Sequence, residues 1–263
     1  MSLLAGIDFS GSVSAGNSIW ICTAEIRGKG LLVTDLQPAR DLPGSSPLRE
    51  EALASLVDFL LTRGELLVGM DFPFTLPEAL TGCKGWQKFV LDFSESFSTP
   101  DQFRDCCLHM AGGREWKRPV EIESQVPFSA YNLRLYRQTF HGIRDVLAPL
   151  LYSDAVYVPG LMPRCKRRIT ALEACPACWL KKRDMYFPYK GKSMDARSNR
   201  EQILDEIESV YRVVFCNENL REAVLANAAG DALDAVLSVL CVRAVMDRLQ
   251  EAAILQGEGL IAC

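Results

Sequence analysis

The sequence contains no long apolar run, no basic N-terminal region followed by an apolar stretch, and no overall excess of positive charge. Its apolar stretches are shorter than the ~18 residues that cross a membrane, and its start does not have the pattern of a signal peptide. These absences lead us to expect a cytoplasmic protein with no membrane partner. The net charge of −4 speaks against a generally basic coat for nucleic acid.

Internal repeats, low-complexity tracts and a regular cysteine framework are also absent. The chain has 263 residues, of which 49% are apolar and 24% charged, and this length can bury a large core. Ten cysteines are spread from Cys22 to Cys263 without the spacing of a small disulfide-rich protein, so we expect reduced thiols. We predict a single α/β domain over residues 1–263.

The positive charge that is present is concentrated in one segment. Residues 163–200 contain eleven Lys and Arg against three acids, a local charge of +8, so the remainder of the chain carries −12. An acidic body with one basic segment suits a phosphate-bearing partner better than the total charge suggests. The alternative is a solvated face or a mobile loop.

The first seventy residues have the pattern of a mixed sheet. Residues 3–8, 18–26 and 31–36 read as strands joined by short turns, so these three strands are predicted to be antiparallel. Apolar residues at helical spacing over 47–62 predict a helix. The all-apolar run 66–70 that follows is typical of a central parallel strand with both faces covered.

The rest of the chain divides into an insertion and a largely helical C-terminal part. Residues 77–168 hold mixed helical patches and glycine-rich points, and we interpret them as a large, mainly helical insertion over the sheet, a lid or a substrate-binding lobe. We predict a helix over 133–151, a strand over 169–174, and helices that begin at Trp179 and cover 198–211, 220–228 and 231–253.

The predicted strands and helices place four aspartates near one another. Asp8 and Asp71 each close an apolar strand, and the ends of adjacent parallel strands meet at one sheet edge. Asp231 and Asp234 are three residues apart in an apolar helix, so they share a face. Residues 225–242 contain no Lys or Arg to pair with them, and an unpaired buried carboxylate is costly unless it binds metal. Such oxygen ligands suit Mg²⁺ or Mn²⁺.

Each aspartate also has a simpler explanation. A strand-end Asp such as Asp8 is often only a turn-former, and Asp231, after Gly230, has the place of a helix N-cap. Asp234 lies inside the predicted helix and resists that explanation. The joint pattern is therefore more specific than any of its members.

Several words of the sequence resemble a known family. They are Gly6-Ile7-Asp8-Phe9-Ser10-Gly11, Gly69-Met70-Asp71-Phe72-Pro73-Phe74, Leu172-Glu173-Ala174-Cys175-Pro176, Tyr189-Lys190-Gly191 with Arg200 downstream, and Gly230-Asp231-Ala232-Leu233-Asp234-Ala235. Their order resembles the RNase H-like fold, in the branch with Holliday-junction resolvases, and the words themselves resemble the domain of unknown function 429 family of predicted RNase H-like nucleases.

The resemblance implies a divalent-metal-dependent nuclease that hydrolyses phosphodiesters with Mg²⁺ or Mn²⁺, on an RNase H-like core. It implies metal-binding roles for Asp8, Asp71, Asp231 and Asp234, with Glu173 as a further catalytic candidate. From the charge pattern we expect a nucleic-acid partner bound by the basic segment. The residues expected to border the acids and hold phosphates are Lys166, Arg167, Arg168, Lys190, Lys192 and Arg197.

Other functions remain open at this point. The first glycine-containing word also resembles a phosphate loop of the actin and sugar-kinase ATPases, although the duplicated domain of those proteins has no counterpart here. A non-catalytic metal- or nucleic-acid-binding module is a second alternative. Cys175 and Cys178 have the spacing of a redox pair at a helix start, or are two ordinary thiols.

Three further features have both a functional and a structural reading. Zinc would need Cys165 together with Cys106, Cys107 or His109, at irregular spacings. His141 is either a base or phosphate contact, or an ordinary helix histidine. The run 116–118, Trp-Lys-Arg, either grips a nucleic-acid strand or anchors the insertion.

Overall fold

Eight strands form one mixed β-sheet in the computed structural model, which describes residues 3–82, 85–249 and 259–263. The strands are β1 (Leu3–Asp8), β2 (Trp20–Arg27), β3 (Gly30–Pro38), β4 (Leu66–Met70), β5 (Val156–Tyr157), β6 (Ile169–Ala174), β7 (Val213–Phe215) and β8 (Ile261–Ala262). Their order is β5-β6-β4-β1-β2-β3-β7, with β8 beside β6.

The strand directions confirm the predicted fold class. β1, β2 and β3 are consecutive and antiparallel, while β4 is parallel to β1 and β6 is parallel to β4. Three antiparallel strands followed by parallel neighbours on the far side of β1 are the arrangement of an RNase H-like core. The predicted strands over 66–70 and 169–174 coincide with β4 and β6.

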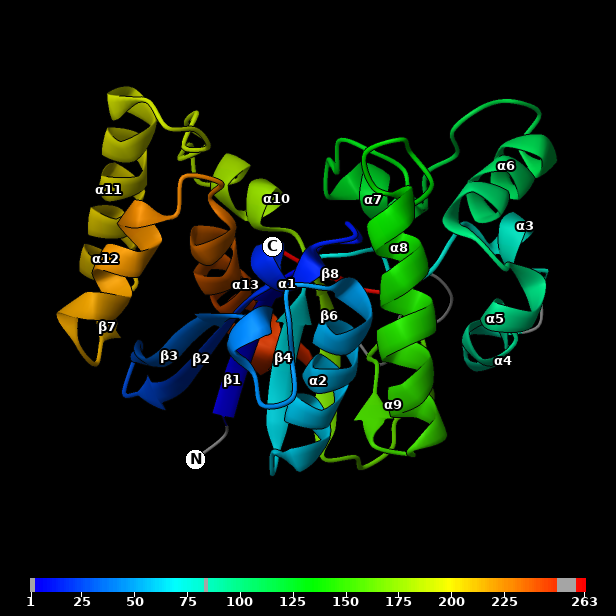
Figure 1. The fold of residues 1–263 in the computed structure, drawn as a ribbon, viewed down its shortest axis with the longest axis horizontal. Helices are drawn as coiled ribbons and strands as arrows, with labels where there is room; N and C mark the ends of the chain where they lie inside the picture. The colour runs from blue at the N-terminus through cyan, green and yellow to red at the C-terminus, as the bar shows by residue number, and fades with distance from the viewer. Residues whose placement is uncertain (1–2, 83–84, 250–258) are drawn as a thin grey trace.

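Helices cover both faces of the sheet (Figure 1). They are α1 (Ala15–Ser18), η1 (Ala39–Asp41), α2 (Arg49–Thr62), α3 (Glu78–Thr81), α4 (Trp86–Leu91), α5 (Phe93–Ser96), α6 (Pro100–Met110), α7 (Pro119–Glu123), α8 (Tyr136–Gly142), η2 (Ile143–Leu147), α9 (Ala148–Tyr152), α10 (Pro176–Lys181), α11 (Met194–Ser209), α12 (Glu218–Ala226), α13 (Asp231–Val245) and η3 (Met246–Arg248).

Alternation along the strands divides the core into two layers. In β1, Ala5 and Ile7 pack in the layer that contains α2 and α8, whereas Leu4 packs in the layer of α13. Gly6 and Gly69 let α13 lie directly on the sheet. A Cβ at Gly6 would lie 2.2 Å from the Ala235 carbonyl oxygen, and one at Gly69 would lie 2.6 Å from Val242 Cγ2. These glycines therefore fix where α13 begins relative to the strand ends.

The predicted insertion carries α3 to α9 between β4 and β6, but it is not wholly helical. Its last part forms β5, which pairs with β6 and extends the sheet. The helix predicted over 133–151 is a continuous run of α8, a π-helical segment (η2) and α9. Figure 1 shows this run standing beside α2, with α3 to α6 farther from the sheet.

Short strands and helix ends differ from the sequence prediction. β5, β7 and β8 have two or three residues each. They were not predicted because strands this short cannot show an alternating pattern of apolar and polar residues. The helix predicted over 231–253 ends at Val245, and residues 250–253 lie outside the described part of the chain. In that part, no single helix is long and apolar enough to span a membrane; only α12 with α13 and η3 pass together, bent by 117°.

Candidate functional site

The register of the sheet brings Asp8 and Asp71 side by side. Ile7 is the partner of Met70 in the parallel pair β1–β4, so the next residue of each strand is an aspartate at the same level. The Asp71 amide donates to the Ile7 carbonyl at 2.9 Å, which extends the ladder to this point. Residues at one level of adjacent strands point to the same face, and both carboxylates therefore lie on the face that carries α13.

Helix α13 supplies the other two aspartates. It begins at Asp231, after Gly230 in a left-handed conformation (φ 88°), and its first turn contains Asp231 and Asp234. Because α13 crosses Gly6 with its Ala235 turn, this first turn lies beyond the carboxyl ends of β1 and β4. The N-terminal end of a helix dipole favours negative charge nearby. The expected convergence of the three acidic segments is thus present.

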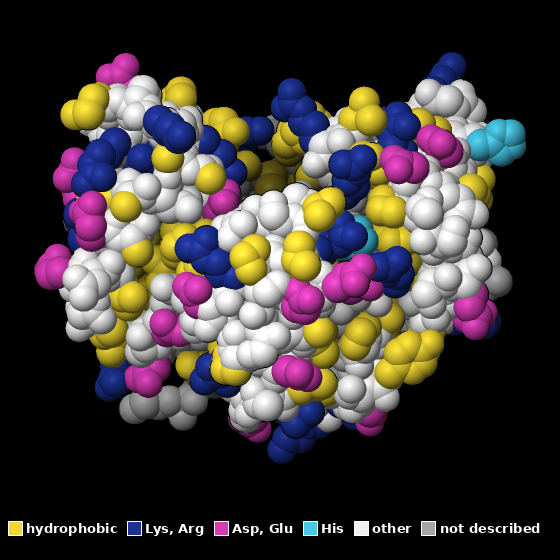
Figure 2. Space-filling model, in the orientation of Figure 1, with side chains coloured by type: hydrophobic (Ala, Val, Ile, Leu, Met, Phe, Trp, Pro, Cys, Tyr) yellow, Lys and Arg dark blue, Asp and Glu magenta, His cyan; other side chains and the backbone are white. Residues whose placement is uncertain are grey.

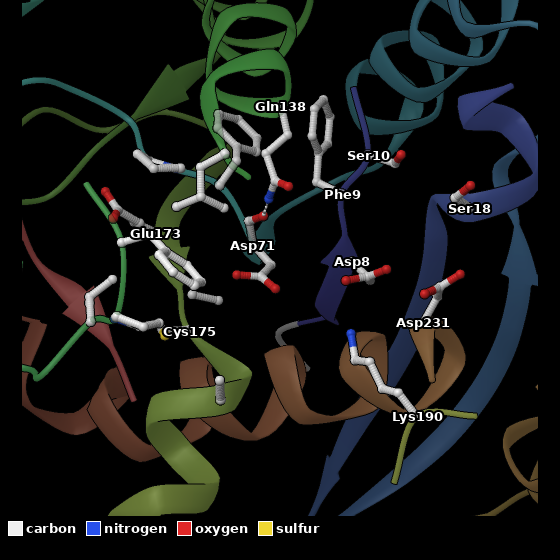
Figure 3. A pocket seen from close by; sticks show the side chains of 18 of the residues that line it. Asp8, Phe9, Ser10, Ser18, Asp71, Gln138, Glu173, Cys175, Lys190 and Asp231 are labelled. Carbon is white, nitrogen blue, oxygen red and sulfur yellow. Dashed lines mark hydrogen bonds between the residues drawn. The ribbon is translucent and has the colours of Figure 1, made fainter. Parts of the chain in front are cut away.

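These carboxylates open into a cavity of about 350 Å³, to which Asp8, Asp71 and Asp231 contribute. The cavity lies between α10 and the Tyr186–Lys190 loop on one side and the segments around α7 and α8 on the other. Figure 2 shows the surface hollowed between these two sides. In Figure 3 the carboxylates of Asp71, Asp8 and Asp231 follow one another along the cavity. Gln138 holds the edge by donating to the Asp71 carbonyl at 2.8 Å.

Three of the four carboxylates that line the cavity, those of Asp8, Asp71 and Asp231, have no partner among the described residues, while the fourth, Glu173, is paired with Arg118. Within the described chain, no hydrogen bond or ion pair reaches the side chain of Asp8, Asp71 or Asp231. Burial, and then Asp234, Asp231 and Asp71, raise the pKa of Asp8 well above its usual value. Burial and Asp234 raise the pKa of Asp71 to about 8, and burial raises that of Asp231 to about 6. A cation bound in the cavity would therefore stabilise the charged form of these carboxylates.

Asp234 is in a different state from the other three. It is 2% exposed, accepts a hydrogen bond from the Tyr189 hydroxyl at 2.6 Å and pairs with Lys190 Nζ at 2.7 Å. Burial lowers the pKa of Lys190, but Asp234 and Asp8 raise it by more. The expectation that Asp234 has no basic partner was wrong, because the partner comes from a loop 44 residues earlier in the chain rather than from its own helix.

Lys190 and Tyr189 are held by Arg200, whose guanidinium donates to the Tyr189 carbonyl at 2.6 Å and to the Gly191 carbonyl at 3.2 Å. Tyr189 and Lys190 belong to the Tyr189-Lys190-Gly191 motif, which is part of the family resemblance. That motif was the signal that could have assigned Lys190 to the acids rather than to phosphates. The side chain of Lys190 is 55% exposed, so its ammonium is a cation that can move away from Asp234.

The donors suit a hard divalent ion in kind, since all are carboxylates. As placed, however, no group of three or more His, Cys, Asp or Glu side chains in the described residues is arranged to hold a metal ion. Two of the oxygens that would be needed, those of Asp234, are engaged by Tyr189 and Lys190. A closed ligand set therefore requires side-chain rotation of Asp8, Asp71 or Asp231.

Glu173 has a structural partner that the sequence did not reveal. Its carboxylate forms a two-pronged ion pair with Arg118, at 2.6 Å and 3.0 Å, and accepts from the Phe74 amide at 3.0 Å. Arg118 is 0% exposed and also binds Glu121, at 3.0 Å. Glu173 is the partner of Met70, one level before Asp71, so its side chain points to the opposite face. It lines the same cavity as the aspartates, but its pairing with Arg118 makes it an anchor of the insertion.

The predicted basic residues do not gather at the acids. Lys166, Arg167 and Arg168 precede β6, and the Arg168 carbonyl accepts from Leu66 at the start of β4, so they lie at the opposite end of the strands. Arg167 pairs with Asp154 at 2.6 Å. Among the other predicted phosphate ligands, Arg197 pairs with Glu222, Lys192 is exposed, and Lys190 alone lines the cavity.

The two cysteines of the Cys-Pro-Ala-Cys word lie close together at the start of α10. Their Sγ atoms are 2.6 Å apart, and Cys175 lines the cavity. The hydrogen bond between them lowers the pKa of Cys178 and raises that of Cys175. The zinc alternative has no support, since no set of His, Cys, Asp or Glu in the described chain is arranged for a metal.

The remaining candidates are structural in part. His141 is 2% exposed and its Nδ1 lies 2.7 Å from Asp145, while burial lowers the pKa of its ring. In the Trp-Lys-Arg run, Arg118 is the buried anchor and Lys117 donates to the Val126 and Pro127 carbonyls. The anchoring interpretation of this run therefore fits the structure.

Comparison with known proteins gives little beyond this. No protein-family model and no curated protein matches the chain. A solved structure that is similar is the yeast mitochondrial Holliday junction resolvase Ydc2, at 10% identity over 94% of this chain and 85% of that one, with a TM-score of 0.33. Strand order and strand direction define the fold.

Proposed function

We propose that the protein is a divalent-metal-dependent nuclease that hydrolyses phosphodiester bonds at the Asp8–Asp71–Asp231 cavity. The observation that carries this proposal is the set of three unpaired carboxylates at the ends of β1, β4 and the start of α13, open to one cavity. The resemblance to the domain of unknown function 429 family also implies an RNase H-like core with acids at these positions. We propose membership of that family on the same residues.

A Mg²⁺ or Mn²⁺ ion bound by Asp8, Asp71 and Asp231 would supply Lewis-acid charge for the attack of water on a phosphodiester. The chain's own groups prepare the cavity for this. Lys190 holds Asp234 and partly balances the acids, and Gln138 fixes the end of β4 through the Asp71 carbonyl. Phe9 and Phe72, whose ring centroids are 4.6 Å apart, form an apolar wall.

The other candidate functions fit less well. An ATPase of the actin or sugar-kinase type uses a duplicated core, whereas the described strands form a single sheet. A non-catalytic module would keep the acids for binding alone. It differs from the nuclease in one result, which is binding of a divalent ion or nucleic acid without cleavage.

The test is a cleavage assay with fluorescently labelled single-stranded, duplex and branched DNA and RNA in the presence of Mn²⁺. We expect at least one substrate to be cut by the parent, and the rate to fall by roughly a hundredfold or more in the Asp8→Asn and Asp71→Asn variants, because each removes a charge at the reacting centre. Asp58→Asn, an exposed carboxylate of α2, is the matched control and should cut like the parent. No cleavage by the parent on any substrate would contradict the proposal.

A further inference from the structure

A groove leads away from the acidic cavity along α8. Three neighbouring hollows share residues: Ser10 and Gln138 line both the acidic cavity and a second hollow of about 320 Å³. Gly11 and Arg137 line both this second hollow and a third of about 360 Å³. The hollows therefore adjoin one another in a row. The row starts at the carboxylates and ends between α2 and the α8–η2 run.

The groove has the charge that the cavity lacks. Four arginines line it, and they are Arg49, Arg134, Arg137 and Arg144. Glu50 is the acid that lines it, and Asp145 lies behind it, bound to Arg144 at 2.7 Å and to His141. Figure 2 shows this grouping as dark-blue side chains around a histidine in front of α8, with acids beside them.

Three of these arginines have no carboxylate partner in the described chain, namely Arg49, Arg134 and Arg137. Arg49 donates from Nη1 to the Gly11 carbonyl at 3.3 Å. Its buried Nε has no hydrogen-bond partner among the described residues. By contrast, Arg167 and Arg197 of the basic segment are each paired with an acid. Arg134 and Arg137 lie instead over the rings of Phe128 and Tyr136. A guanidinium group without a carboxylate partner is suited to phosphate, which accepts two parallel hydrogen bonds from it.

The floor of the groove is held in place by close backbone contact. A Cβ at Gly11 would lie 2.4 Å from the carbonyl carbon of Arg137, so the turn after β1 rests directly on α8. A Cβ at Gly142 would lie 2.4 Å from the ring of Phe72, which fixes the same helix against the end of β4. The backbone of Arg137 in α8 is therefore fixed relative to the ends of β1 and β4, where Asp8 and Asp71 lie.

We infer that this groove binds the sugar–phosphate backbone of the nucleic-acid strand whose scissile phosphodiester lies at the carboxylates, with Arg49 and Arg137 on its phosphates. The inference rests on the proposed function. Arg137 is next to Gln138, which lines the acidic cavity, and it lines both further hollows, so it lies between the carboxylates and the far end of the groove.

Binding without cleavage separates this inference from the nuclease proposal. We would measure the fluorescence anisotropy of a labelled single-stranded oligodeoxyribonucleotide and of its duplex in EDTA, over a series of salt concentrations. The Arg49→Gln/Arg137→Gln double variant should bind roughly tenfold more weakly, and the slope of log affinity against log salt should become shallower by about 1.4–1.8, for two lost phosphate contacts. Arg137→Lys should keep most of the salt slope because the charge remains.

The matched control is the Lys166→Gln/Lys192→Gln double variant, which removes the same charge from exposed residues of the basic segment. It should bind like the parent. Equal weakening in both double variants, an unchanged affinity in the groove variant, or no binding by the parent would overturn the inference. If the parent binds but never cleaves, the groove stands and the nuclease proposal fails. If the groove variant binds and cleaves like the parent, the groove fails and the nuclease proposal stands.

Discussion

Two groups of carboxylates line one cavity at neighbouring strand ends, and they differ in the face of the sheet that they occupy and in their partners. Glu173 on β6 is buried against Arg118, with both oxygens accepting hydrogen bonds. Asp8 and Asp71 on β1 and β4 line the same cavity from the other face of the sheet and have no partner among the described residues. The cause is a register difference of one residue, since Glu173 is level with Met70 and Ala174 is level with Asp71.

The comparison separates structural acids from functional ones. A buried charge is tolerated when it is paired and hydrogen-bonded, and the Arg118 cluster meets that condition. The aspartates of the cavity do not, and burial first, then the neighbouring carboxylates, raises their pKa values. We infer that the first group holds the insertion on the core, while the second is kept for a cation. Removing a charge should therefore have opposite consequences in the two groups.

The largest effect should come from breaking the paired group. Arg118→Met leaves Glu173 and Glu121 buried without their cation, and should lower the free energy of unfolding by about 3–5 kcal/mol. Urea denaturation followed by circular dichroism measures this. Arg27→Met removes an ion pair of which Arg27 is 55% exposed and should stay within about 0.5 kcal/mol of the parent. A similarly small change for Arg118→Met would contradict the claim that the Arg118 cluster stabilises the fold.

A second test compares Asp234, which has partners, with Asp8, which has none among the described residues. Because Asp234 is bound by Tyr189 and Lys190, Asp234→Asn should destabilise the metal-free protein by about 1–3 kcal/mol. Asp8→Asn removes an unpaired charge from the same cluster and should leave the metal-free protein as stable as the parent or more so. Thermal unfolding in EDTA compares the two. Equal destabilisation in both variants would mean that Asp8 is as firmly paired as Asp234.

A smaller, pH-dependent effect should follow from the raised pKa values of Asp71, about 8, and Asp231, about 6. The unfolded chain releases these protons near the ordinary value of 3.8. Between about pH 4 and pH 8 the native state thus binds more protons, and the stability of the metal-free protein falls as pH rises through this window. Asp71→Asn should reduce that fall, and Asp58→Asn should not. Parallel curves for all three proteins would contradict the assigned protonation of Asp71.

Much of the core could be predicted from the sequence because its signals are local. The apolar run at β4, ending in an aspartate, and the helical spacing of α2 each lie within one segment. The proximity of Asp8 and Asp71 followed from strand direction, and the place of α13 from its two acids on an apolar helix and from the family resemblance. Gly6 and Gly69, which seat α13 on the sheet, belong to the same words as Asp8 and Asp71.

The pairing of the acids could not be predicted, since it depends on contacts far apart in the chain. Arg118 reaches Glu173 across 55 residues and Lys190 reaches Asp234 across 44. The count of charges over 163–200 did not show that Lys166 to Arg168 precede β6, whereas the acids follow β1 and β4. Charge density along a sequence does not say at which end of a strand the charge will lie.

The central claim is that Asp8 and Asp71, unlike Glu173, are held for a divalent cation. Isothermal titration calorimetry of Mn²⁺ into the parent and the Asp8→Asn, Asp71→Asn and Asp58→Asn proteins tests it most directly. We predict saturable binding to the parent and to Asp58→Asn, a thermal stability that rises with Mn²⁺, and loss of both effects in Asp8→Asn and Asp71→Asn. Absence of Mn²⁺ binding to the parent, or equal binding to all four proteins, would contradict the account.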